Sequence, residues 1–190
     1  MPHSPQQRGF ALAVTAAAAI AVAGAAAPAS AATPASSAIV LGVVDERPTY
    51  KIDNVVTGGH LVPEGWGSNS NDIPIYAVVS DLGNGWNFRE RRDLDGWAYY
   101  QIRNSTTKKC IRPAPFAVGN RTLVIQETCD TADSYQYWRV ERSISSPQRV
   151  QIINRASEDA FQPWTPLNVD QWVFMTNPGT DLTHWVLRPQ

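Results

Sequence analysis

Residues 50–63 read YKIDNVVTGGHLVP, and the same skeleton of residues returns twice further along the chain. Residues 100–113 read YQIRNSTTKKCIRP, and residues 150–163 read VQIINRASEDAFQP. A fixed period of this length is typical of a fold built from repeated supersecondary units, in which equivalent positions need similar side chains. The recurring positions are Tyr50, Tyr100 and Val150; Ile52, Ile102 and Ile152; Asn54, Asn104 and Asn154; Thr57, Thr107 and Ser157; Leu61, Ile111 and Phe161; and Pro63, Pro113 and Pro163.

A tryptophan near the end of each repeat is the second shared landmark. Trp86, Trp138 and Trp185 are each followed two residues later by another apolar residue, which is the alternation of a β-strand. Glycine, asparagine and proline clusters separate further extended runs, and no segment shows a sustained helical period. These extended runs cover residues 74–80, 122–128 and 171–176.

Each repeat therefore predicts about four short strands, and one such unit cannot bury its apolar face alone. Three units closing around a common axis can do so, which predicts an all-β fold with three pseudo-symmetric four-stranded repeats. We place the units at about 49–98, 99–148 and 149–190. The repeated isoleucines and tryptophans should fill the core, and the repeated Asn and Thr or Ser should fix the turn after the first strand.

The N-terminal part of the chain reads as a targeting segment. Residues 1–31 combine one charge, an alanine-rich apolar run and an A-x-A cleavage site, which predicts a signal peptide and a secreted protein. Residues 32–48 read as a linker or lead-in segment, and its apolar part, residues 39–44, either packs as a strand or stays free. No later run is long and apolar enough to span a membrane.

Composition narrows the function classes. Without Arg8 the chain carries 15 Lys and Arg against 17 Asp and Glu, and this near-neutral balance argues against nucleic acid as a partner. The two histidines after the signal peptide, His60 and His184, occupy positions that the repeat explains structurally. No catalytic, metal-binding or phosphate-binding motif is present, so we expect a non-enzyme that needs no cofactor.

The two cysteines, Cys110 and Cys129, indicate a disulfide, because oxidised pairs are the default in exported proteins. The alternative is zinc, for which two cysteines without a nearby histidine supply only half of a tetrahedral shell.

The middle unit resembles the ricin B-type lectin domain. It has Cys110-Ile111, then LVIQETC ending at Cys129, then Gln136-Tyr137-Trp138, in the order of that family's C-L, V-x-L-x-x-C and Q-x-W motifs. The resemblance covers about residues 49–190 and implies a β-trefoil fold, a disulfide between Cys110 and Cys129, and a binding role, most often for sugars.

The sugar site of that family is not carried over. Its key aspartate would stand two residues after the first cysteine, where this chain has Arg112, and the equivalent residues of the other units are Val62 and Gln162. The family's aromatic platform is replaced by Glu127, and the asparagine before the Q-x-W glutamine is replaced by Tyr135.

A sugar site at a non-standard place remains the leading hypothesis. The third unit contains QPWTPLNVDQW, in which two tryptophans flank amides and a carboxylate, as a sugar platform requires. The alternative is that one tryptophan is core and the other an ordinary loop residue. The candidate ligand-binding residues are Trp164, Trp172, Asn168, Asp170 and Gln171, with Trp66 as a second platform in a turn.

Two other functions stay open. The first unit also resembles fungal trefoil peptidase inhibitors, for which Arg91-Arg92 or Lys108-Lys109 would be the bait. The chain resembles more loosely the binding subunits of cytolethal distending toxins, which would make it a partner-dependent adhesin. The expected partner is thus a glycan or glycoconjugate, with a protease or another extracellular protein as the alternatives.

Overall fold

The computed structural model describes residues 40–41, 43–65, 67–80 and 84–190, so the predicted signal peptide and Trp66 lie outside the described residues. This part of the chain is built from β-strands and two single-turn 3₁₀ helices, η1 (Ser134–Gln136) and η2 (Asp181–Thr183). None of its helices has the length and apolarity that crossing a membrane requires.

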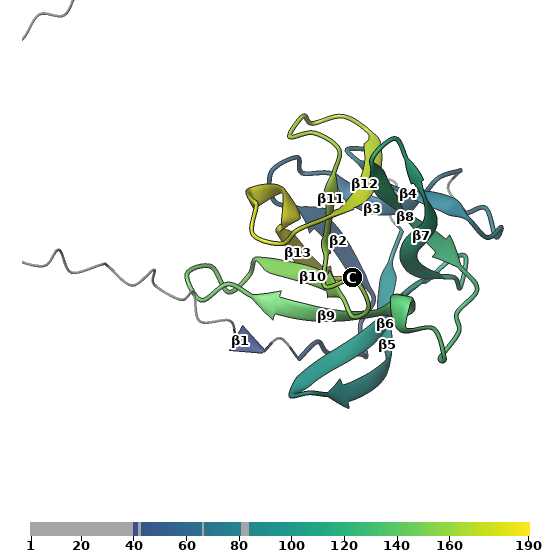
Figure 1. Ribbon diagram of the computed structural model, residues 1–190. Coiled ribbons are helices and arrows are strands. Elements are labelled where there is room, and N and C mark those ends of the chain that lie inside the picture. The colour runs from purple at the N-terminus through teal and green to yellow at the C-terminus, as the bar shows by residue number, and fades with distance from the viewer. Residues whose placement is uncertain (1–39, 42, 66, 81–83) are drawn as a thin grey trace, which may run out of the picture. The chain divides into compact units, whose positions relative to one another are not determined.

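Six strands close into a barrel, two from each unit (Figure 1). Each barrel strand pairs antiparallel with the next, and the last pairs with the first, so the ring has no free edge. In ring order the barrel strands are β2 (Tyr50–Asn54), β5 (Trp86–Leu94), β6 (Trp97–Asn104), β9 (Tyr137–Arg142), β10 (Val150–Asn154) and β13 (Trp185–Pro189).

The other two strands of each unit form a hairpin, and the three hairpins join in a triangular cap. Their second strands pair with one another, β4 with β8, β8 with β12 and β12 with β4, and these three lie together in Figure 1. A closed barrel capped by three hairpins is the predicted β-trefoil. The hairpin strands are β3 (His60–Pro63) with β4 (Ile73–Val78), β7 (Cys110–Val118) with β8 (Arg121–Glu127), and β11 (Ala160–Pro163) with β12 (Gln171–Thr176).

The recurring residues occupy equivalent places, as predicted. Ile52, Ile102 and Ile152 are fully buried in one core cluster. The three repeated tryptophans are buried as well, and each indole N–H donates to a backbone carbonyl in the second strand of its own unit. These pairs are Trp86 with Leu61, Trp138 with Ile111 and Trp185 with Phe161.

The repeated asparagine fixes the turn after the first strand of each unit. In the third unit Asn154 Oδ1 accepts the backbone N–H groups of Ala156 and Ser157, while Nδ2 donates to the carbonyls of Tyr135 and Tyr137 in the preceding unit. The side chain therefore links two units besides closing a turn. The residue four positions after each repeated asparagine has a left-handed backbone, with φ of 70° at Gly58, 61° at Lys108 and 59° at Glu158.

The apolar lead-in segment, which the sequence left open, packs on the barrel. Strand β1 (Val40–Leu41) pairs with β9, and Val44 is buried in the core cluster. The backbone N–H of Val44 donates to the hydroxyl of Tyr100 at 3.1 Å, which ties this segment to the second unit.

The two cysteines form the predicted disulfide, with a sequence separation of 19 residues. Cys110 is the first residue of β7, and Cys129 lies just beyond the end of β8. The bond therefore holds the base of the second hairpin together.

The hairpin between β5 and β6 joins the first two units and lies at the bottom of Figure 1. Its tip is the two-residue turn Asp95-Gly96, with φ of 53° and 81°, which suits the right-handed twist of the strands. The register shifts between Arg89 and Arg92, where Glu90 has a φ of 52°. One extra residue in β5 therefore forms a β-bulge.

Replacing Asn154 by alanine should lower the free energy of unfolding by about 3 kcal/mol, because several hydrogen bonds worth about 1 kcal/mol each are lost in a buried place. Urea denaturation measures the change. The control Asn168→Ala alters an exposed loop residue and should change stability by less than about 0.5 kcal/mol. Equal effects of the two substitutions would contradict the role of Asn154.

Reducing the disulfide should cost about 3 kcal/mol, as expected from the loop that it closes. Denaturation with and without dithiothreitol measures the difference. The Cys110→Ala/Cys129→Ala variant should be insensitive to the reductant, and a wild-type protein that is equally insensitive would refute a stabilising role for the bond.

Candidate functional site

The two candidate tryptophans of the third unit both lie on the surface. Trp164 is 43% exposed and Trp172 is 38% exposed, so neither is a core residue. Each contacts the buried ring of Phe174, at centroid distances of 4.5 Å and 6.4 Å. The alternative in which one of the two tryptophans belongs to the core is therefore wrong.

Backbone pairing between the ends of β11 and β12 places the two tryptophans. Trp164 follows β11, and its backbone N–H donates to the carbonyl of Trp172 in β12 at 3.1 Å, which continues the hairpin. The guanidinium of Arg121 lies 4.2 Å from the centroid of the Trp164 ring. One face of Trp164 is therefore covered by a cation, whereas Trp172 has no such cover among the described residues.

The side chain of Gln171 organises the loop between the two tryptophans. Its Oε1 accepts the backbone N–H of Thr165, and its Nε2 donates to the carbonyls of Leu167 and Val169. The side chain is buried, and its amide is used within the loop. Gln171, which the sequence suggested as a ligand contact, is thus a residue that positions Trp164 and Asp170.

Asp170 links the third unit to the first. One carboxylate oxygen accepts the backbone N–H of Val79 at 2.9 Å, and the other makes no hydrogen bond within the described residues. Trp172 pairs across the cap with Tyr76 of β4, and their rings meet edge to face at 6.2 Å. The carboxylate and the indole therefore border the same junction.

Tyr76 and Glu64 complete this junction from the first unit. The Tyr76 hydroxyl donates to Glu64 Oε1 at 3.3 Å. Burial and the nearby Glu64 carboxylate raise the pKa of Tyr76 above its ordinary value, so the phenol keeps the proton that it donates to Glu64.

A hollow of about 330 Å³ lies at the junction, and we call it the Trp172 hollow. It is lined by Tyr76, Trp164, Asp170, Gln171 and Trp172. A second hollow of about 180 Å³ lies beside it and shares Tyr76 and Asp170, with Glu64 on its far side. The Trp172 hollow thus combines three aromatic side chains with a carboxylate, and the smaller hollow adds the carboxylate of Glu64.

Of the remaining predicted residues, Asn168 is exposed in the loop and does not line either hollow. Trp66 lies outside the described residues. The sequence did not single out Tyr76 or Glu64, which lie about 100 residues before Trp172 in the chain. The alternation of β4, with Ile75 and Ala77 buried on either side of Tyr76, was the signal for an outward tyrosine.

The positions that would form a galactose-type site are occupied by other interactions. Arg112 forms an ion pair with Asp133 at 2.8 Å and lies over the Tyr135 ring. Val62 is buried, and the amide of Gln162 accepts the hydroxyl of Thr180. The structure thus agrees with the inference that this site is not carried over.

The two suggested protease baits are not presented as extended loops. Arg92 lies in β5, where its guanidinium donates to the carbonyl of Thr131 and stacks on Tyr137. Lys108 has a left-handed backbone, and the Lys109 ammonium bonds to Asn71 and Thr128. Arg91-Arg92 therefore lies in a paired strand, and Lys108 departs from an extended backbone, so neither dipeptide lies in a free extended loop.

Comparison with known proteins finds no family model that matches the chain and no match among curated proteins. Solved structures do match. The designed threefold-symmetric protein ThreeFoil has a TM-score of 0.64 at 20% identity, covering 75% of this chain and 99% of its own. The Rhizoctonia solani agglutinin has a TM-score of 0.59 at 16% identity, covering 78% of this chain and 99% of its own.

The cytolethal distending toxin from Actinobacillus actinomycetemcomitans matches with a TM-score of 0.59 at 15% identity, covering 76% of this chain and 92% of the matched one. Identities this low establish the fold and not the family. The chain is a β-trefoil, and agglutinins and toxins are among the proteins that share its architecture.

Proposed function

We propose that this protein is a secreted β-trefoil that binds carbohydrate, and that the Trp172 hollow is its binding site. The observation that carries the proposal is the meeting of a partly exposed indole, an available carboxylate and a tyrosine hydroxyl at one junction between the third and first units.

The chemistry of the hollow fits a sugar ring. The face of Trp172 offers apolar surface for the C–H groups of the ring, since an indole combines a large flat face with a polar edge. Asp170 accepts hydrogen bonds from sugar hydroxyls through its available oxygen, and Glu64 offers another carboxylate beside it. A few placed polar groups around aromatic surface are the usual composition of a small-ligand site.

An agglutinin is among the proteins of this architecture, and its name denotes a binding protein, which supports a binding role for this chain. The Trp172 hollow offers the indole of Trp172 and the carboxylate of Asp170 as a hydrogen-bond acceptor. We therefore assign it to recognition without a chemical step. Export follows from the predicted signal peptide over residues 1–31.

A protein partner is the second candidate, favoured by the apolar rim of the loop. Leu167 is 61% exposed, and Val169 beside it is also exposed. Exposed apolar side chains next to two tryptophans would extend a sugar site into a protein-binding surface.

Trp172→Ala should abolish binding to the neutral glycans that the wild-type protein recognises on a glycan array, because the platform for the sugar ring is removed. Trp97→Ala is the matched control, since it removes a partly exposed tryptophan that lines neither hollow, and it should leave the pattern unchanged. An array without neutral-glycan signal for the wild type would overturn the proposal and favour the protein partner.

Asp170→Asn should weaken the affinity for the same glycan about tenfold, because a hydrogen bond to a charged acceptor is worth more than one to a neutral amide. The amide oxygen still accepts the Val79 N–H, so the fold is kept. Isothermal titration calorimetry measures the change. Asp181→Asn, an exposed aspartate of η2, should have no effect, and an equal loss in both variants would argue against a direct contact.

A further inference from the structure

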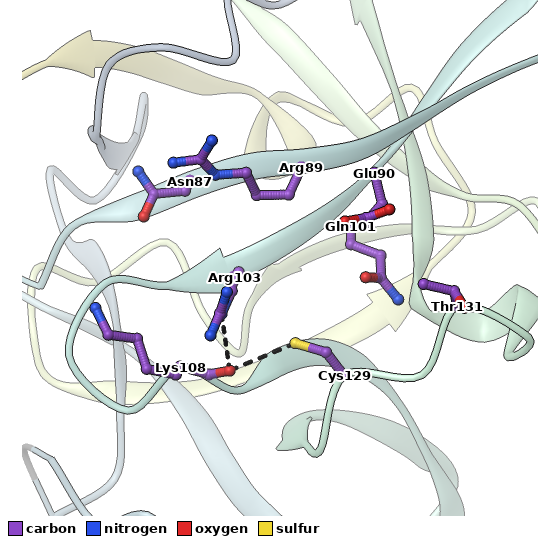
Figure 2. Close-up of a pocket in the computed structure, with 8 residues that line it drawn as sticks. All are labelled: Asn87, Arg89, Glu90, Gln101, Arg103, Lys108, Cys129 and Thr131. Carbon is purple, nitrogen blue, oxygen red and sulfur yellow. Dashed lines mark hydrogen bonds between the residues drawn. The ribbon is translucent and has the colours of Figure 1, made fainter.

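Another pocket, of about 480 Å³, lies between the β5–β6 hairpin and the loop that follows β8 (Figure 2). Its volume falls within the range of small-ligand sites, and its walls come from separate elements. It is lined by Asn87, Arg89, Glu90, Gln101, Arg103, Lys108, Cys129 and Thr131, and we call it the cationic pocket.

Positive charge dominates this lining. Arg89, Arg103 and Lys108 face one acidic residue, Glu90, although the whole chain has a formal charge of −1. Figure 2 shows the three cationic groups toward one end of the pocket, with Glu90 at the other end near Gln101. Anionic groups entering the cationic end would meet an attractive potential.

These three cations make no ion pair within the described residues, whereas five other arginines there do. Arg103 donates from Nε to the carbonyl of Lys108, and the Lys108 ammonium donates to the carbonyl of Ser105. Their remaining donors point to no carboxylate. The arginines that do form ion pairs are Arg47 with Asp45, Arg91 with Asp93, Arg112 with Asp133, Arg139 with Glu141, and Arg188 with Asp53.

Strand pairing holds two of the cations close to each other. Arg89 pairs with Gln101, and Asn87 pairs with Arg103, so Arg89 and Arg103 occupy diagonal positions on neighbouring strands. Such positions are about 7–8 Å apart, within reach for long side chains. Like charges gathered this way repel each other, and a bound anion would relieve that repulsion.

The backbone that lines the cationic pocket is irregular at Glu90, the residue after Arg89. Glu90 has a φ of 52° within the bulge of β5, a conformation that costs energy for a residue with a side chain. Bulges re-aim side chains and are frequent beside binding sites. The bulge turns β5 just after Arg89, so its register and the placement of the cations are coupled.

The opposite wall is fixed by the disulfide. The carbonyl of Lys108 accepts a hydrogen bond from Arg103 Nε at 3.0 Å and lies 3.5 Å from the disulfide sulfur of Cys129 (Figure 2). The buried Gln101 forms the floor, where its amide donates to the carbonyl of Asp130. Hydrogen bonds to backbone carbonyls therefore hold the side chains of Arg103 and Lys108, and strand pairing places the backbone of Arg89.

We propose that the cationic pocket binds the oxyanion group of an acidic sugar, a carboxylate or a sulfate, within an oligosaccharide chain. Guanidinium groups match the planar geometry of a carboxylate and bind sulfate well, because both accept paired hydrogen bonds. The lining has no aromatic side chain on which a nucleic-acid base would stack. Its hydroxyl and amide groups suit sugar hydroxyls instead.

Calorimetry of the whole protein with two acidic probes tests the proposal. The probes are a galacturonate trimer for the carboxylate and a heparin tetrasaccharide for the sulfate, with a galactose trimer as the neutral control. One acidic probe should bind, the neutral control should bind far more weakly in this pocket, and affinity should fall as salt is raised from 50 to 300 mM. The probe that binds identifies the oxyanion.

Arg89→Ala and Arg103→Ala should each weaken that binding at least about tenfold, since each removes a charge-assisted contact. Glu90→Gln should strengthen it about two- to threefold by removing the one negative charge of the lining. Arg149→Ala, at an exposed arginine outside the pocket, is the control for net charge and should change little.

Trp172→Ala should leave the acidic probe bound, so failure of the Trp172 hollow and failure of this pocket give different results. Absence of binding by both acidic probes would overturn the proposal, as would equal losses in the Arg149 control and in the pocket variants. A hexaglutamate peptide that binds more tightly than either sugar would also refute it and would assign the pocket to an acidic peptide.

Discussion

In each unit a buried indole donates its N–H to a backbone carbonyl, and the rest of the fold depends on this contact. The tryptophan belongs to a barrel strand, and the carbonyl belongs to the hairpin of the cap, as in Trp138 with Ile111. An unpaired indole or carbonyl in this core would be costly, so the bond sets where the hairpin meets the barrel. Three copies of the bond fix three hairpins in equivalent positions, and the Trp172 hollow lies at the junction between two of them.

Much of this architecture could be predicted, because symmetry makes the same demand three times. Ile52 alone says little, but its return as Ile102 and Ile152 identifies a core position whatever the exact strand boundaries. The turn role of the repeated asparagine followed from the same logic. The link of Asn154 to the preceding unit did not, since its partner carbonyls lie in another repeat.

The candidate sites were only partly predictable, for a physical reason. Trp164 and Trp172 are close in sequence, and their composition suggested a platform. Tyr76 and Glu64 reach the same place only because β4 pairs with β12, and such a pairing between distant segments leaves no local pattern. Gln171 shows the opposite failure: its residue type suited a ligand, but the loop needs its amide. The bulge at Glu90 depends on pairing register, which no short stretch of sequence specifies.

The closure of the barrel through β2 and β13 has a consequence for how the three units are ordered. The last residue, Gln190, donates its backbone N–H to the carbonyl of Thr49, so both ends of the repeat array meet at one seam. The three units form a closed ring, and the order of the units along the chain decides between which two of them the ends of the array lie. The Trp172 hollow lies between these two units, the third and the first. In a circularly permuted chain that began with the third unit, the third and first units would be successive in sequence. The two walls of the Trp172 hollow would then be separated by fewer residues of chain.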